Sequence, residues 1–290
     1  MQKLLNRRDF MKGTAAAAMG AAIGLSPEQM QKTRVVLIRH KDALDQNSKH
    51  NAPIIQRMLD QAVMTLTRTK DPINAWEKLI KPDNVVGIKT NVWRYLPTPP
   101  ELEGAIKKRL LDVGVKEENI GFNDRGVRND SLFQKATALI NTRPLRTHYW
   151  SGIGGCIKNL ITFGERWPDY HPDSCADLGL LLKLPQVQGK IRLNILSVLN
   201  PQFHGRGPHH FDPRYVWNYK GLIVSTDTVA VDAVGLKLIQ AKRLKHFGEE
   251  IELETTPKHV KVAGEKHKVG VADWNKIELI KLGWKEGILI

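Results

Sequence analysis

The feature that most constrains the fold is an alternation of short apolar runs with segments of helical periodicity. Arg34–Arg39, Val85–Asn91 and Asn119–Asn123 are short, largely apolar runs of the kind that form buried strands. Between them, Ala52–Leu66 and Pro99–Val113 have their apolar residues at helical spacing. Alternating strands and helices are typical of a parallel sheet covered by helices. We therefore predict an α/β fold with a mainly parallel sheet and helices on both faces.

The second half of the chain continues this pattern and then changes character. Two more strands and a helix are predicted at Lys190–Leu199, Gly221–Ser225 and Val229–Leu244. The tail, residues 245–290, mixes Lys and Glu with short β-rich pieces such as His259–Ala263. We expect a small β-rich C-terminal cover on a single α/β domain that spans residues 27–290.

The N-terminal residues have the pattern of an export signal. Asn6–Lys12 reads N-R-R-D-F-M-K, a twin-arginine motif, and Gly13–Leu25 is a weakly apolar, alanine-rich run. That run is shorter than the roughly 20 residues that a membrane-spanning helix needs. We predict a Tat signal peptide at residues 1–26, the Tat translocase as a partner during export, a periplasmic location and no transmembrane span. Cleavage and retention of the signal both stay open.

The chain is strongly basic. Its formal charge is +14, and without residues 1–26 it keeps 40 basic and 29 acidic side chains, or +11. Such a balance favours anionic ligands or acidic partners, although solvated lysines give the same count. Nucleic acid is not an expected partner, because the signal directs the protein out of the cytoplasm and no basic and aromatic interleaving is present.

A glycine-rich stretch marks the middle of the chain. An extended polar segment ends at Thr147 and His148, three glycines follow, and an apolar run carries Lys158 and Asn159. The glycines are Gly152, Gly154 and Gly155. We interpret this as a turn that leads into a helix and offers backbone amides and a lysine to an anion. The alternative is a tight turn with Lys158 in solvent. Ile157 breaks both common phosphate-binding motifs, so nucleotide binding is not indicated.

Other candidates lie near strand ends or on a helix. Lys89 and Asn91 close the strand at Val85–Asn91, and ligands gather at the carboxyl ends of parallel strands. Exposed strand ends explain them equally well. Asp227 is placed to cap the following helix, and Asp232 lies among its apolar residues. A buried Asp232 needs a partner such as Lys158 or a ligand, whereas an exposed one does not.

Metal-capable side chains are frequent after the glycine stretch. Five of the ten histidines lie between positions 148 and 210. Weak candidates for a metal site are His171, Asp173, Cys175, His204 and His209. Their spacing fits no common zinc motif, and the nearby prolines and glycines favour plain polar loops. Cys156 and Cys175 leave three readings open: a disulfide, a reactive thiol or small buried residues.

Three motifs together resemble one family. They are V-G-I-K-T-N at Val86–Asn91, T-H-Y-W-S-G-I-G-G-C-I-K-N-L at Thr147–Leu160 and S-T-D-T-V-A-V-D-A-V-G at Ser225–Gly235. In this order and spacing they resemble the family called domain of unknown function 362, over roughly Arg34–Trp284. The biochemistry of that family is uncharacterised, so the resemblance implies no reaction.

The resemblance does imply a redox-related setting, because some members carry iron–sulphur ferredoxin modules. This chain has two cysteines and no C-x-x-C run, while a [4Fe–4S] cluster normally takes four thiolates. We therefore expect no cluster ligated by this chain alone. The resemblance makes a separate ferredoxin-like protein a candidate redox partner.

Two functions remain. The first is an enzyme or cofactor-handling protein that binds an anionic or metal-bearing ligand; the reaction, the cofactor and any catalytic residue stay unassigned. The second is a non-catalytic periplasmic module for an anionic or redox partner. The ligand-binding candidates are Lys89, Asn91, His148, Gly154, Gly155, Lys158, Asn159, His171, Asp227 and Asp232.

Overall fold

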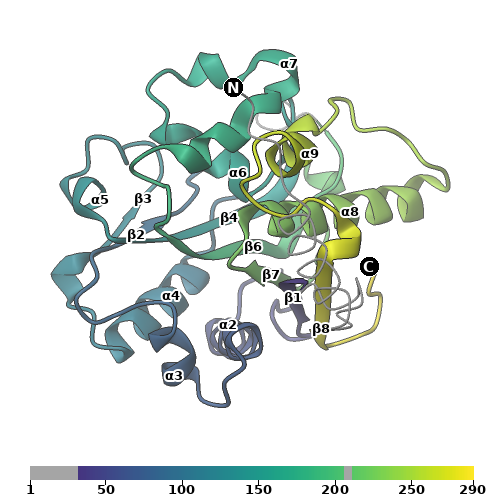
Figure 1. Cartoon of the computed structure of the whole chain (residues 1–290). Coiled ribbons are helices and arrows are strands. Elements are labelled where there is room, and N and C mark those ends of the chain that lie inside the picture. The colour runs from purple at the N-terminus through teal and green to yellow at the C-terminus, as the bar shows by residue number, and fades with distance from the viewer. Residues whose placement is uncertain (1–31, 206–210) are drawn as a thin grey trace, which may run out of the picture. The chain divides into compact units, whose positions relative to one another are not determined.

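The computed structural model describes residues 32–205 and 211–290. Thr33–Ile290 form one compact unit around an eight-stranded sheet (Figure 1). The strand order is β3-β2-β4-β6-β7-β1-β8, with β5 paired to β4. The strands are β1 (Thr33–Arg39), β2 (Val86–Lys89), β3 (Ile120–Asn123), β4 (Ala138–His148), β5 (Gly152–Gly154), β6 (Ile191–Gln202), β7 (Gly221–Ser225) and β8 (Ile277–Gly283).

The predicted α/β class and the mainly parallel sheet are confirmed. Strands β3, β2, β4 and β6 run parallel to one another, so their carboxyl ends share one edge of the sheet. Strand β7 is antiparallel to both of its neighbours, β6 and β1. Strand β8, which comes from the C-terminal tail, pairs in parallel with β1 at the sheet edge, so the tail extends the main sheet.

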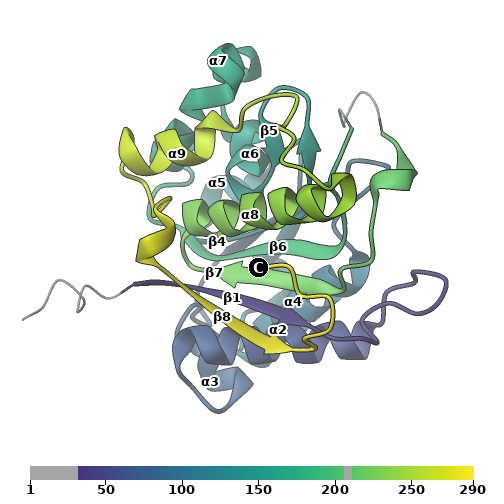
Figure 2. The same cartoon turned by 90° about the vertical axis from the view of Figure 1, so that its right-hand side faces the viewer.

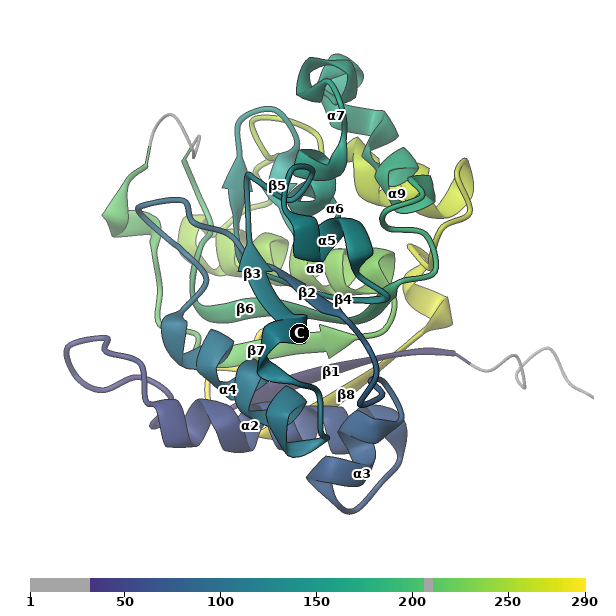
Figure 3. The same ribbon diagram turned by 90° about the vertical axis from the view of Figure 1, so that its left-hand side faces the viewer.

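Helices cover both faces of the sheet, as predicted. Figures 2 and 3 show α2 (Ala52–Thr67), α3 (Pro72–Glu77) and α4 (Pro100–Asp112) on one face. The other face carries α5 (Ser131–Lys135), α6 (Cys156–Asn159), α7 (Pro172–Cys175), α8 (Thr228–Phe247) and α9 (Lys258–Glu265). Adjacent residues of β1 show why two cores form: Val36 packs into one apolar cluster and Leu37 into the other, since side chains alternate across a strand.

The β-rich interpretation of His259–Ala263 is wrong, because these residues lie in α9. His259, Val260 and Ala263 are buried, a spacing that places them on one face of a helix. This face packs against residues 176–183 and carries His259 into the interior.

Two predictions fall on parts of the chain that the structure does not describe, and a third concerns membrane spans. The signal peptide at residues 1–26 and His209 lie outside the described residues. Within residues 32–205 and 211–290, no helix is both long enough and apolar enough to cross a membrane.

Candidate anion-binding site

A row of polar residues crosses the buried sheet. Asn123, Lys89, Asn141, Asn194 and Ser225 are register partners on β3, β2, β4, β6 and β7. The Asn141 amide donates to the Asn194 side chain at 3.2 Å and to the Cys156 carbonyl at 2.9 Å. Buried polar groups of this kind must be hydrogen-bonded, and here the bonds fix the start of α6 over the sheet.

Asn159 joins α6 to the end of β2. Its Oδ1 accepts hydrogen bonds from Lys89 Nζ and from Asn91 Nδ2, both at 3.3 Å. Its Nδ2 donates to Asn141 Oδ1 at 2.9 Å. The structure therefore brings together three of the predicted candidates, and Asn159 holds them in place.

Lys89 has a charged partner inside the protein. Its ammonium lies 2.5 Å from Asp124 Oδ1 and 2.8 Å from the Thr90 carbonyl. Burial lowers the pKa of Lys89 to about 8, against the opposing effect of Asp124. Burial alone would raise the pKa of Asp124, but the charge of Lys89 and hydrogen bonds from Lys89 and the Val92 amide hold it below its ordinary value. This corner of the site is charge-compensated.

The glycine turn does bind an anion through its backbone amides, but that anion is the carboxylate of Asp232. The amides of Cys156 and Ile157 donate to Asp232 at 2.6 and 2.8 Å. Burial raises the pKa of Asp232 to about 7 against these bonds. A Cβ atom on Gly155 would lie 2.3 Å from Asp232 Oδ1, so only glycine fits here. These two amides are consequently not free for an external ligand.

Two buried arginines of β4 lie beside the turn. Arg143 donates to the Gly155 carbonyl at 3.3 Å, and Arg146 donates to Asn91 Oδ1 at 3.3 Å. The Nε atom of each arginine is buried and has no hydrogen-bond partner. A Cβ atom on Gly154 would lie 2.8 Å from Arg143 Nη2 and 3.4 Å from Arg146 Cγ, so both side chains border this glycine. A register shift between Pro144 and Arg146 brings them to the same side, although positions three apart on a regular strand face opposite sides.

Three more basic side chains interact electrostatically with these arginines: His148, Lys158 and His259. Lys158 is 4% exposed, and its ammonium lies 3.1 Å from His171 Nε2. Burial, then the charges of Lys158 and Arg146, lowers the pKa of His148 well below its ordinary value. Burial, then Lys158 and Arg143, lowers the pKa of His259 to about 3, and neither ring nitrogen of His259 has a hydrogen-bond partner.

We call these residues the basic cluster: Arg143, Arg146, His148, Lys158 and His259. None of the five forms an ion pair with a carboxylate within the described parts of the chain. Arg143, Arg146 and His259 were missed as candidates from the sequence. Two arginines inside a central strand were an available signal, since charged residues are rarely buried without a partner. His259 was missed because its segment was assigned to the wrong secondary structure.

Other predicted candidates serve local contacts elsewhere. Asp227 caps α8 by accepting from the amides of Val229 and Ala230, and it also accepts from the Val271 amide. These hydrogen bonds satisfy both carboxylate oxygens of Asp227, so the side chain needs no ligand.

The weak metal candidates are dispersed in the same way. Asp173 pairs with Lys258, His204 contacts Arg243 at 2.9 Å, and His171 contacts Lys158. Across residues 32–205 and 211–290, no three His, Cys, Asp or Glu side chains are arranged to hold a metal ion. Cys156 and Cys175 are both buried free thiols.

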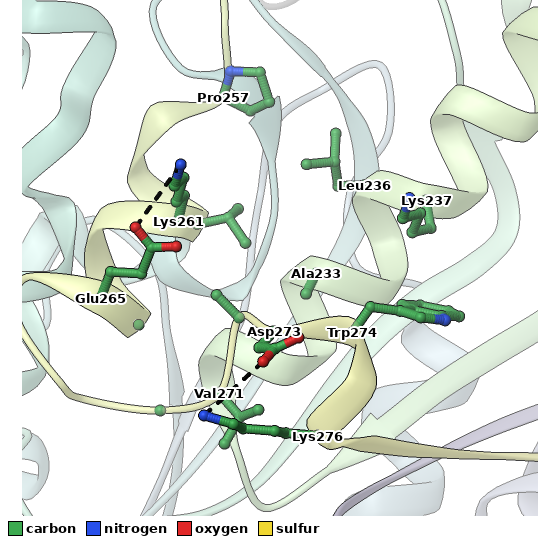
Figure 4. Close-up of a pocket in the computed structure, with 14 residues that line it drawn as sticks. Ala233, Leu236, Lys237, Pro257, Lys261, Glu265, Val271, Asp273, Trp274 and Lys276 are labelled. Atoms are coloured by element: carbon green, nitrogen blue, oxygen red, sulfur yellow. Dashed lines mark ion pairs between the residues drawn. The ribbon is translucent and has the colours of Figure 1, made fainter.

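The basic cluster is closed off from the main surface cavities. A cavity of about 590 Å³ lies between α8, α9 and residues 270–276 (Figure 4), and none of the predicted candidates lines it. His148 borders a hollow of about 10 Å³, which has room for about one water molecule. A ligand larger than a water molecule would therefore fit only if the surrounding side chains moved.

The comparisons with known proteins agree with the predicted resemblances. Residues 113–237 match the family described as domain of unknown function (DUF362), and residues 4–24 match the twin-arginine translocation pathway signal sequence. The chain thus contains a region that matches the DUF362 model and a segment that matches a signal for export across the cytoplasmic membrane. The matched region is shorter than the region over which the sequence resembles the family. It includes the motifs at Thr147–Leu160 and Ser225–Gly235 but not the one at Val86–Asn91. No curated protein and no solved structure matches the chain significantly.

Proposed function

We propose that this exported protein binds a small, multiply charged anion in the basic cluster, and that it acts there as an enzyme or cofactor-handling protein in a redox-related setting. One observation carries the proposal. Arg143 and Arg146 are almost fully buried, and each keeps an unpartnered guanidinium Nε. Buried charges normally have ionic partners, and an orphaned buried donor costs about 1–3 kcal/mol. An oxyanion would supply the missing charge and the missing acceptors.

The charge balance indicates that the anion carries more than one negative charge. Lys89 neutralises Asp124, and Asp232 is occupied by the glycine turn. Among the described residues, Arg143, Arg146 and Lys158 have no carboxylate within ion-pair distance, although the charges of Asp124 and Asp232 act on Arg143 from farther away. Lys158 adds a third positive charge below its pKa of about 8. A phosphate ester or a dicarboxylate matches this excess of charge and offers several oxygen acceptors.

The enclosed position of the cluster suggests when the ligand is acquired. A ligand that must pass a closed surface is most easily taken up as the chain folds. The Tat route carries folded proteins, so the protein would load its anion in the cytoplasm and deliver it to the periplasm. Export in a folded state and an enclosed site both support binding of the anion before export.

A second candidate function is a non-catalytic periplasmic module that binds a redox partner. The net charge of +11 without residues 1–26 favours it, because such a surface attracts acidic proteins. In this case the partner could be a separate ferredoxin-like protein, and the isolated protein would contain no small anion.

Native mass spectrometry of protein exported through its own signal tests the first proposal. We expect an additional mass that is lost on denaturation. Refolding the denatured protein in the presence of pyrophosphate should raise the melting temperature, and Arg143→Gln or Arg146→Gln should weaken pyrophosphate binding about tenfold or more. The matched control is Arg166→Gln, because Arg166 is 77% exposed, and it should bind like the unaltered protein. Equal pyrophosphate binding by all four proteins would reject the proposed site.

A further inference from the structure

We propose that Lys158 is a nucleophilic amine that forms a Schiff base with an anionic aldehyde or ketone, and that His171 is the base that takes its proton. This inference rests on the proposed function, because Arg143 and Arg146 would hold the anionic group of the substrate. It adds a reaction and a substrate class to the binding site.

The contact between Lys158 and His171 is the first support. Lys158 Nζ lies 3.1 Å from His171 Nε2, within reach for a nucleophile and its base. An ammonium group can only donate, so His171 Nε2 must be the acceptor, and the ring proton is then on Nδ1. Among the described residues, Lys158 has no carboxylate within ion-pair distance that would hold it in its charged form.

The surroundings of the pair lower the cost of forming the neutral amine. Burial lowers the pKa of Lys158 to about 8, and the charge of Arg143 acts in the same direction, against Cys175. Burial and the nearby Lys158 charge also lower the pKa of His171, so the imidazole is neutral near pH 7 and can accept a proton. A neutral lysine amine is the form that attacks carbonyl groups.

The segment that follows His171 is held in a strained conformation. Asp173, Ser174 and Cys175 have φ values of 50°, 57° and 62°, three consecutive left-handed residues without a glycine. The left-handed backbone region is unfavourable for residues other than glycine, and strain of this kind clusters at functional sites. The imidazole of His171 also lies against the Trp150 ring, with centroids 4.5 Å apart. Packing and backbone together fix the base over the amine.

The proposed reaction balances without any further reagent. The Lys158 ammonium gives one proton to His171 Nε2, and the free amine then adds to the carbonyl carbon to form a carbinolamine. The attacking nitrogen passes a second proton to the alkoxide oxygen formed by the addition, and the resulting hydroxyl takes up the proton from His171 and leaves as water. The products are a protonated imine that keeps the positive charge of Lys158, one water molecule and His171 in its original protonation state.

Reductive trapping tests the inference on the folded protein. With glyoxylate and cyanoborohydride, peptide mass spectrometry should find a carboxymethyl group on Lys158 before any other lysine. Lys89 is the internal control, since it is equally buried but paired with Asp124. Lys158→Arg should abolish the modification, and Lys158→Met serves as a second variant should the arginine disturb folding. His171→Gln should slow it about a hundredfold at neutral pH and shift the pH profile to higher pH.

The outcomes separate this inference from the proposed function. Modification confined to surface lysines, or equal modification of Lys158 by glyoxylate and by neutral acetaldehyde, would overturn it. Binding of pyrophosphate that depends on Arg146, without trapping at Lys158, would leave the anion site standing and reject the nucleophile. Trapping at Lys158 that pyrophosphate does not slow would reject the shared anion site.

Discussion

Two buried lysines on the same face of the sheet have similar acidity and opposite surroundings. Burial lowers the pKa of both Lys89 and Lys158 to about 8. Lys89 faces the Asp124 carboxylate at 2.5 Å, whereas Lys158 faces the neutral His171 imidazole at 3.1 Å. The difference teaches that burial sets the cost of a charge, and that the partner decides whether the charge is structural or available for a ligand.

The largest expected effect comes from removing the partner in the compensated corner. Asp124→Asn leaves the Lys89 charge buried without a counter-ion and should lower the free energy of unfolding by about 3–5 kcal/mol. Urea denaturation near neutral pH measures this. The double variant Lys89→Met with Asp124→Asn should recover at least half of the loss, because no uncompensated charge remains. A loss below about 1 kcal/mol in the single variant would show that the ion pair is not what fixes this corner.

A methyl group at the glycine turn should disturb both corners, because α6 carries Lys158 and Asn159. Gly155→Ala places a carbon 2.3 Å from Asp232 Oδ1, and we expect a loss of about 2–3 kcal/mol in the free energy of unfolding. Gly104→Ala on α4 is the matched control. A Cβ atom at Gly104 meets no atom within 4 Å, so this variant should gain up to about 1 kcal/mol. Similar stabilities for the two variants would contradict the described turn.

Removing Lys158, which has no carboxylate partner, should raise the free energy of unfolding and not lower it. Lys158→Met replaces a buried, unpaired charge by an apolar side chain of similar length and should raise the free energy of unfolding by about 2 kcal/mol near neutral pH. The same variant should weaken pyrophosphate binding, because Lys158 contributes to the binding site although its buried charge lowers stability. Thermal unfolding with and without pyrophosphate measures both effects. Destabilisation by Lys158→Met would mean that Lys158 has a compensating partner after all.

The smallest expected effect is a dependence on pH. The folded chain releases the Lys158 proton near pH 8, while the unfolded chain keeps it to about pH 10.5, so the unfolded state binds more protons between these values. The contribution of Lys158 to the free energy of unfolding therefore rises by about 1 kcal/mol as the pH is raised from about 7.5 to about 9. Lys89 acts in the same direction. Urea denaturation of Lys158→Met across this range should show a shallower rise; an unchanged rise would assign the effect to other groups.

Local patterns explain the parts of the fold that the sequence predicted well. Helix α2 was expected at Ala52–Leu66 and spans Ala52–Thr67, and β1 was expected at Arg34–Arg39 and spans Thr33–Arg39. In both, apolar spacing reports directly on which face is buried. The same rule was available for α9, but a short segment with few apolar residues gave a weak signal, and the predicted strand was wrong.

For this protein, the sequence by itself determined the α/β class, the export signal and the polar side chains at the carboxyl ends of β2 and β4. Only the tertiary structure decided which charges meet. Asp232 reaches the glycine turn from more than 70 positions away, and His259 enters the interior from a helix near the C-terminal end. Pairings between distant residues leave no periodic trace in the chain, since they depend on how the sheet and its helices stack. Whether a buried lysine is neutralised or left free is therefore a property of the folded molecule.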